Sequence, residues 1–105
     1  MNNDADLQKK FLTALRFILS SNIRINILFS LYDRNKDIND LKKELKKRPE
    51  NILREIKKLN QKGFVEKKDK TYYLSSTGVL IVLQSINFVI STHLQHYIVN
   101  FGMII

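Results

Sequence analysis

Basic side chains are concentrated in the middle of the sequence, where residues 34–70 contain 14 of the 18 Lys and Arg. Within it, Ile52, Ile56 and Leu59 recur at helical spacing and predict a helix with one buried face. The opposite face then carries five polar residues: Asn51, Arg54, Glu55, Lys57 and Lys58. Asparagine and arginine make paired hydrogen bonds to adenine and guanine edges in the DNA major groove, and lysine suits phosphates. This face therefore has the chemistry needed to read a DNA sequence.

More positive charge lies on both sides of this predicted helix. Lys67, Lys68 and Lys70 follow it and are placed to reach an adjacent DNA backbone or minor groove. Five basic residues precede it and suit phosphate contacts: Lys42, Lys43, Lys46, Lys47 and Arg48. The chain has 18 Lys and Arg against 10 Asp and Glu, a formal net charge of +8. A lysine-rich helix face is often only a solvated surface, so the order of the surrounding elements decides between the two interpretations.

Hydrophobic spacing and cap residues predict the elements that position these side chains. The predicted helices lie over residues 6–20, 23–32, 39–47 and 49–62 and from residue 77 into the nineties, and the predicted strands over 64–67 and 71–74. Asp37 or Asn39 is expected to cap the third helix, Pro49 suits the first position of the fourth, and Gly63 suits its end. Residues 33–37 are expected to form a polar turn. The predicted fold class is mainly α with a small β-hairpin (α+β).

Three short helices followed directly by a two-stranded hairpin form the layout of a winged helix. Residues 20–78 resemble the winged helix-turn-helix transcriptional regulators of the ArsR/MarR type, especially their archaeal members. The most similar stretch is NILREIKKLNQKGFVEKKDKTYYLSSTG, with a recognition helix, a glycine before two apolar residues, a charged hairpin and a Tyr-x-Leu-Ser-x-x-Gly ending. The resemblance implies sequence-specific binding of double-stranded DNA, with the fourth helix in the major groove and the hairpin, or wing, on the backbone or minor groove.

The resemblance also implies roles for single residues. Arg24, at the start of the first core helix, is expected to contact a phosphate. Together with the residues discussed above, the predicted DNA-contacting set is Arg24, Lys47, Arg48, Asn51, Arg54, Lys57, Lys58, Lys67, Lys68 and Lys70. The chain departs from the pattern at the turn before the recognition helix, where Lys47, Arg48 and Pro49 replace small residues. Glu50 and Glu55 near DNA lower affinity unless they accept from cytosine or pair within the protein.

The last 35 residues, from residue 71 onward, contain no charged side chain. We therefore divide the chain into an N-terminal amphipathic helix (1–21), a winged helix-turn-helix DNA-binding domain (22–78) and a C-terminal apolar helix (79–105). A heptad-like stripe runs along the last segment and includes Leu80, Leu83, Asn87, Ile90, Leu94 and Tyr97. This stripe predicts a homodimer in which Asn87 fixes the register, and a dimer suits two DNA half-sites.

Other interpretations of this tail and of the fold stay open. A second stripe, through Val82 and Ile86, is placed to pack on the N-terminal helix of the same chain or of a partner. The tail is long enough for a membrane anchor, but eight polar residues interrupt it, which makes a span the weaker interpretation. In a third interpretation, the tail packs on a separate partner chain. The winged helix itself could serve as a protein-interaction module instead of binding DNA.

Several classes of function find no support in the sequence. Without cysteine, disulfides and thiolate metal sites are excluded. His93 and His96 lie one helical turn apart, but no carboxylate follows residue 69 to complete a metal site. No catalytic constellation, cofactor motif or small-molecule site is recognisable, so an enzyme is not expected. The N-terminus lacks the charged and apolar regions of a signal peptide, which makes the cytoplasm the expected location.

Overall fold

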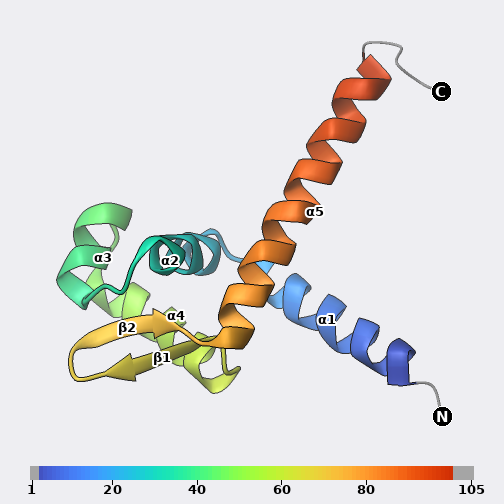
Figure 1. Ribbon diagram of the computed structural model, residues 1–105. Coiled ribbons are helices and arrows are strands. Elements are labelled where there is room, and N and C mark those ends of the chain that lie inside the picture. The colour runs from blue at the N-terminus through green and yellow to red at the C-terminus, as the bar shows by residue number, and fades with distance from the viewer. Residues whose placement is uncertain (1–2, 101–105) are drawn as a thin grey trace.

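A computed structural model describes the backbone of residues 3–100 and the side chains of residues 4–88, 90 and 91. Seven elements follow one another along the chain (Figure 1): α1 (Asn3–Leu19), α2 (Asn22–Asp33), α3 (Ile38–Leu45), α4 (Pro49–Gln61), β1 (Val65–Lys68), β2 (Thr71–Leu74) and α5 (Ser76–Asn100). The predicted order of elements and the fold class are confirmed. The predicted ends differ from the observed ends by a few residues, most at the start of α1.

The helices of the winged part begin at residues that suit helix starts. The Asp37 side chain accepts from the backbone N–H of Asp40, and the Asp40 carboxylate accepts from the backbone N–H of Asp37, which makes a capping box for α3. Pro49 occupies the first turn of α4, where its missing N–H costs no hydrogen bond. The Ser75 hydroxyl accepts from the Gly78 N–H at the start of α5. The predicted cap at Asp37 and the predicted place of Pro49 are thus confirmed.

The ends of α3 and α4 both require a left-handed backbone. Gly63, directly after α4, has φ +83°, which glycine adopts without steric cost and which confirms its predicted place. Lys46, directly after α3, has φ +54°, although it carries a Cβ atom. The helix therefore stops at Leu45, two residues before the predicted end, and the turn to α4 begins with a residue in an unfavourable conformation.

The hairpin is antiparallel, and its register pairs Val65 with Leu74 and Lys68 with Thr71. A third segment extends it, because Lys36 and Tyr72 exchange backbone hydrogen bonds of 3.1 and 2.8 Å. The polar turn predicted over residues 33–37 is therefore also an edge of the wing. The Lys36 side chain is 3% exposed, so it is part of the interior and not of a solvated turn.

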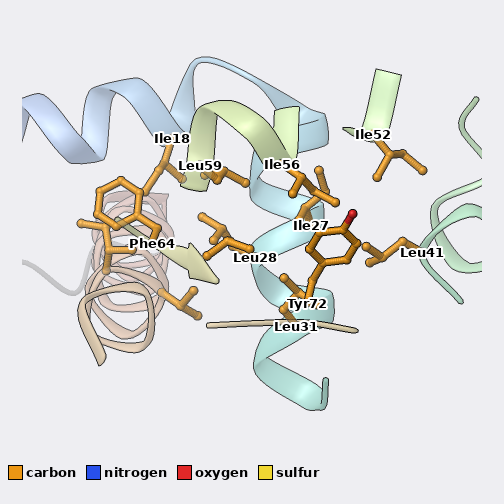
Figure 2. Close-up of a cluster of buried hydrophobic side chains, with 13 residues drawn as sticks. Ile18, Ile27, Leu28, Leu31, Leu41, Ile52, Ile56, Leu59, Phe64 and Tyr72 are labelled. Carbon is orange, nitrogen blue, oxygen red and sulfur yellow. The ribbon is translucent and has the colours of Figure 1, made fainter. Parts of the chain in front are cut away.

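The hydrophobic core gathers around α2 (Figure 2). The side chains of Ile27, Leu28 and Leu31 share one buried cluster with apolar residues of all the other elements, including Ile18 of α1 and Val82 of α5. The inner face of α4 joins the same cluster through the three residues expected from its spacing, Ile52, Ile56 and Leu59. Burial of one face of α4 on α2 and α3 leaves the opposite face in solvent.

Two helices extend beyond this core as arms (Figure 1). The N-terminal part of α1 and the C-terminal part of α5 both leave the body of the molecule. The radius of gyration is 16.0 Å, whereas a compact domain of this length has about 13 Å. Leu7 shares a stripe with the buried Leu15 and Ile18, yet it is 63% exposed because none of the residues that the structure describes covers that end of α1.

Among the described residues, no single helix combines the length and the apolar character of a bilayer span. Within the described part of the chain, the helices over Asp4–Leu19 and Asn22–Asp33 have the length and apolar character of a span only when taken together, and a bend of 103° separates them.

Candidate nucleic-acid interface

The exposed face of α4 carries the residues that the sequence assigned to it, with one exception. Arg54, Lys57 and Lys58 are exposed, and Asn51 is half-buried near the start of the helix. Glu55 was expected on this face but is buried, so that expectation was wrong. The exposed face is therefore more positive than the sequence pattern indicated. A fifth side chain, Leu53, adds an exposed apolar group of the kind that contacts thymine methyl groups.

Arg54 and Asn51 interact with each other, one helical turn apart. The guanidinium Nη2 of Arg54 donates a hydrogen bond of 2.8 Å to the Asn51 Oδ1 atom. An asparagine that reads adenine needs its oxygen free to accept from the base and its amide free to donate. Since the Asn51 oxygen already accepts from Arg54, this geometry indicates that Asn51 orients Arg54. The hydrogen bond uses one of the five Arg54 donors and leaves four for a ligand.

The wing lies beside α4 and is fixed to it by a partly buried hydrogen bond. The Asn60 side-chain amide donates to the backbone carbonyl of Val65 at 2.8 Å. A groove of about 220 Å³ runs between α4 and the hairpin, and both Lys57 and Lys67 line it. The Lys67 ammonium also stands 5.4 Å from the centre of the Tyr72 ring. The recognition helix and the base of the wing thus bring two predicted DNA contacts to one groove.

The tip of the wing carries the remaining lysines. Lys68 ends β1, and Lys70 lies in the two-residue connection to β2, where Asp69 has φ +57°. Lys67, Lys68 and Lys70 are all exposed, and Lys68 lines a recess that also includes Asn35 of the turn after α2. On the hairpin, a hydrogen bond and the charge of Glu66 raise the pKa of the Tyr73 hydroxyl.

Lys47 and Arg48 lie in the turn immediately before α4 and are exposed. They stand at the N-terminal, positive end of the α4 dipole, which is the end that favours an anion. The structure thus places nine of the ten predicted contact residues on α4, on the preceding turn or on the wing.

Arg24 is the tenth, and its position does not support the predicted phosphate contact. Its side chain is 12% exposed, and its Nε atom donates to a Glu55 carboxylate oxygen at 2.8 Å. Burial raises the pKa of Glu55, but the hydrogen bond and charge of Arg24, with a smaller contribution from Lys58, outweigh this and leave the pKa below its usual range. Glu55 therefore pairs within the protein, which is one of the two conditions under which an acidic residue on this helix is not expected to lower DNA affinity.

A second ion pair, in which the lysine is buried and the glutamate is partly exposed, was missed by sequence reasoning. The Lys36 ammonium donates to Glu44 at 2.6 Å and to the Ser30 hydroxyl at 2.8 Å. The hydrogen bonds from Lys36 and then from Ser30 hold the pKa of Glu44 below its usual range. These residues connect α2, α3 and the edge of the wing. No local pattern marks Lys36 as buried, since its neighbours in the sequence are polar.

The predicted dimerisation residues face away from the core as far as the structure describes them. Leu80 and Ile90 are 62% and 57% exposed, and Leu83 and Asn87 are exposed beside them. Ile81, Val82 and Ser85 form the opposite, buried face of α5. The side chains of Leu94 and Tyr97, and those of His93 and His96, lie outside the described residues. Among the described residues, no group of three His, Cys, Asp or Glu side chains is placed to hold a metal ion.

Three solved structures share this architecture. The quinone-bound YodB from B. subtilis has a TM-score of 0.68 and 17% identity, over 81% of this chain and 96% of that one. The adhesin competence repressor AdcR from Streptococcus pyogenes has a TM-score of 0.60 and 20% identity, over 94% and 84%. A MarR/EmrR family transcriptional regulator from Acinetobacter sp. ADP1 has a TM-score of 0.62 and 15% identity, over 96% and 82%. At these identities the similarity establishes the winged-helix fold alone.

The sequence itself matches one family of regulatory domains. Residues 12–96 match the model of the N-terminal domain of the methanogenesis regulatory protein FilR1. No curated protein sequence matches the chain. The match includes part of α1, the entire winged helix and most of α5, so it extends over all the elements that build the core. The family and the fold are those of transcription regulators and not of enzymes. The chain belongs to the family of the FilR1 N-terminal domain.

Proposed function

We propose that the protein binds double-stranded DNA in a sequence-specific manner, as a homodimer, and regulates transcription by occupying its site. The observation that carries the proposal is the shared surface of α4 and the wing, where exposed Lys57 and Lys67 line one groove and exposed Arg54 lies one helical turn before Lys57 on α4. Two acidic residues that would weaken this surface are accounted for. Glu55 is buried against Arg24, and Glu50 lies in the first turn of α4, where the helix dipole stabilises it.

The residues divide into readers and anchors. Arg54, oriented by Asn51, reads a guanine edge in the major groove, because its free donors match the two guanine acceptors. Leu53 contacts a thymine methyl group on the same helix face. The remaining members of the set hold phosphates without selecting a sequence: Lys47, Arg48, Lys57, Lys58, Lys67, Lys68 and Lys70.

The homodimer forms through the outer face of α5. Leu80, Leu83 and Ile90 leave apolar surface on a helix that projects from the body, and soluble monomers seldom expose such stripes. Asn87 lies within the stripe and fixes the register, as a polar residue does in helix pairs. Leu94 and Tyr97 continue the stripe in the sequence. A two-fold pair of recognition helices then reads two half-sites.

Fluorescence anisotropy with labelled duplexes tests the proposal. The preferred duplex is first selected from a random library with the full chain. Replacing Arg54 by alanine should weaken binding to that duplex by about 5- to 150-fold and relax the preference at one base pair. Replacing Lys68 by alanine should weaken binding to all duplexes alike and reduce the salt slope by about one.

Lys10→Ala on α1 is the matched control, since Lys10 is an exposed lysine outside the proposed surface. It should leave both quantities unchanged. Absence of duplex binding at low salt would exclude the proposal. A protein partner that binds equally well after Lys57, Lys58 and Lys68 are all changed to glutamate would favour an interaction module instead.

A further inference from the structure

One side chain connects three helices. Arg24 belongs to the first turn of α2, and its Nε atom donates to Glu55 of α4 at 2.8 Å. Its Nη1 atom donates to the Phe17 carbonyl in the last turn of α1 and to the Ser20 hydroxyl at 3.1 Å. The guanidinium carbon also lies 4.0 Å from the centre of the Phe17 ring. Both charged partners are almost buried, with side-chain exposures of 12% and 10% for Arg24 and Glu55.

The location of this arginine is unfavourable for its own helix. A cation in the first turn of α2 faces the positive end of that helix dipole. The same guanidinium satisfies a backbone carbonyl at the negative end of α1, where a cation is stabilised. The negative charge of the Glu55 carboxylate offsets the rest of the unfavourable interaction between Arg24 and the α2 dipole. The charge of Arg24 therefore acts between α1 and α4 and not within α2.

Apolar packing relates α1 to α4 at the buried core, which Ile18 and Leu59 share. Helix α1 packs mainly on α2 and α5. An open groove of about 510 Å³ separates it from the end of α4, with Lys9 and Ala14 on one side and Lys62 on the other. The Phe17 ring stands at this groove between two cations, Arg24 at 4.0 Å and the Lys62 ammonium at 5.4 Å. Beyond the shared core, the contacts of Phe17 and Arg24 thus link the two helices.

We propose that Arg24 is a positioning residue for DNA binding, which sets the orientation of the recognition helix α4 relative to α1 without touching DNA. The inference rests on the proposed function and specifies how that function is regulated. Because α1 is one of the two projecting arms, whatever moves α1 is transmitted through Phe17 and Arg24 to Glu55. Docking of a second copy on the arms is then coupled to the spacing of the two recognition helices.

Three variants separate positioning from a phosphate contact. Arg24→Lys keeps the charge but loses the planar fork that reaches both Glu55 and the end of α1. Glu55→Gln removes a negative charge from the recognition helix, so electrostatics alone predicts tighter DNA binding. Arg34→Ala is the matched control, since Arg34 pairs with Asp40 at 3.7 Å on the surface and has a 61% exposed side chain.

If Arg24 positions α4, Arg24→Lys and Glu55→Gln should both weaken binding to the selected duplex by roughly 3- to 30-fold. This range corresponds to the coupling energies found for residues that do not contact the ligand. Both the salt slope and the affinity for random duplex should remain within about twofold of the values for the parent protein, because no phosphate contact is lost. Arg34→Ala should leave all three quantities unchanged. Full binding in Arg24→Lys, or tighter binding in Glu55→Gln, would overturn the proposal.

A distance measurement on the DNA-free protein gives an independent test. Since the chain contains no cysteine, Lys10→Cys on α1 and Gln61→Cys on α4 provide two spin-label positions without further changes. Both Arg24→Lys and Glu55→Gln should broaden the distribution of distances between the labels. An unchanged distribution overturns the proposal, even if the melting temperature falls. If the parent protein binds no duplex, the proposed function fails, and this measurement still decides whether Arg24 orients α4.

Discussion

At the scale of single residues, the structure separates charges that face solvent from charges that hold the protein together. Arg24 and Lys36 are both basic residues in a basic sequence, and both are buried against a glutamate. Neither pairing is local, since Arg24 and Glu55 are 31 positions apart and Lys36 and Glu44 are 8 positions apart. Sequence spacing identifies the amphipathic face of a helix, but it does not identify which charged residue finds a buried partner.

Lys36 gives a prediction about stability. Changing Glu44 to glutamine leaves an ammonium that is 3% exposed without its main charged partner. A buried donor that loses the charged partner of its hydrogen bond costs about 1–3 kcal/mol, so the free energy of unfolding in urea should fall by that amount. The double variant Lys36→Met with Glu44→Gln should recover most of the loss, because it removes both charges from the site.

The surface pair of Arg34 with Asp40 supplies the comparison. Arg34→Gln should change the free energy of unfolding by less than about 0.5 kcal/mol, as is usual for exposed pairs. Equal effects of Glu44→Gln and Arg34→Gln would contradict the assignment of Lys36 to the interior.

At the scale of elements, the sequence predicts the winged part well because its helix starts and turns depend on local chemistry. The capping box at Asp37, Pro49 at the start of α4 and Gly63 after it all lie where the residue types predict. The inner faces of α2 and α4 follow from hydrophobic spacing in the same way. The end of α3 was predicted too late because Lys46 adopts a backbone conformation that its residue type disfavours.

Lys46 therefore offers a stabilising substitution. A residue with a Cβ atom pays roughly 1–2 kcal/mol for the left-handed conformation, and glycine avoids this cost at an entropic loss of about 0.5–1 kcal/mol. Lys46→Gly should thus raise the melting temperature by a few degrees. Lys43→Gly, in the interior of α3, should instead lower stability by about 1 kcal/mol. A decrease in both variants would show that the φ of +54° at Lys46 carries no strain.

At the scale of the whole molecule, the two arms explain why a sequence of 105 residues builds a core that does not cover all of its apolar surface. Predicting the apolar stripe of α5 needed only a heptad pattern, and its described part does face outward. The pairing of α5 with α1 is harder to predict. Of the second stripe, Val82 and Ile86 face inward as expected, but Ile81 and Ser85 are buried beside them because α5 crosses both α1 and α2.

The exposed stripe predicts the oligomeric state. Changing both Leu83 and Ile90 to glutamate places charges on the proposed dimer surface and should convert a dimer of twice 12.4 kDa into a monomer of 12.4 kDa in light scattering. The same substitution at the exposed Thr77, also on α5, should leave the dimer intact. A parent protein that is already monomeric at micromolar concentration would contradict the dimer.

The charge boundary at the wing has a consequence for how the protein responds to its solution. Every charged side chain lies at or before Lys70, whereas the exposed stripe of α5 is apolar and uncharged. Rising ionic strength screens phosphate contacts and weakens DNA binding steeply, but it does not weaken the association of apolar surfaces. The two surfaces are therefore sensitive to different variables. We therefore expect salt to weaken the proposed DNA binding and protein concentration to control the proposed dimerisation, so that protein eluted from DNA by salt leaves as a dimer.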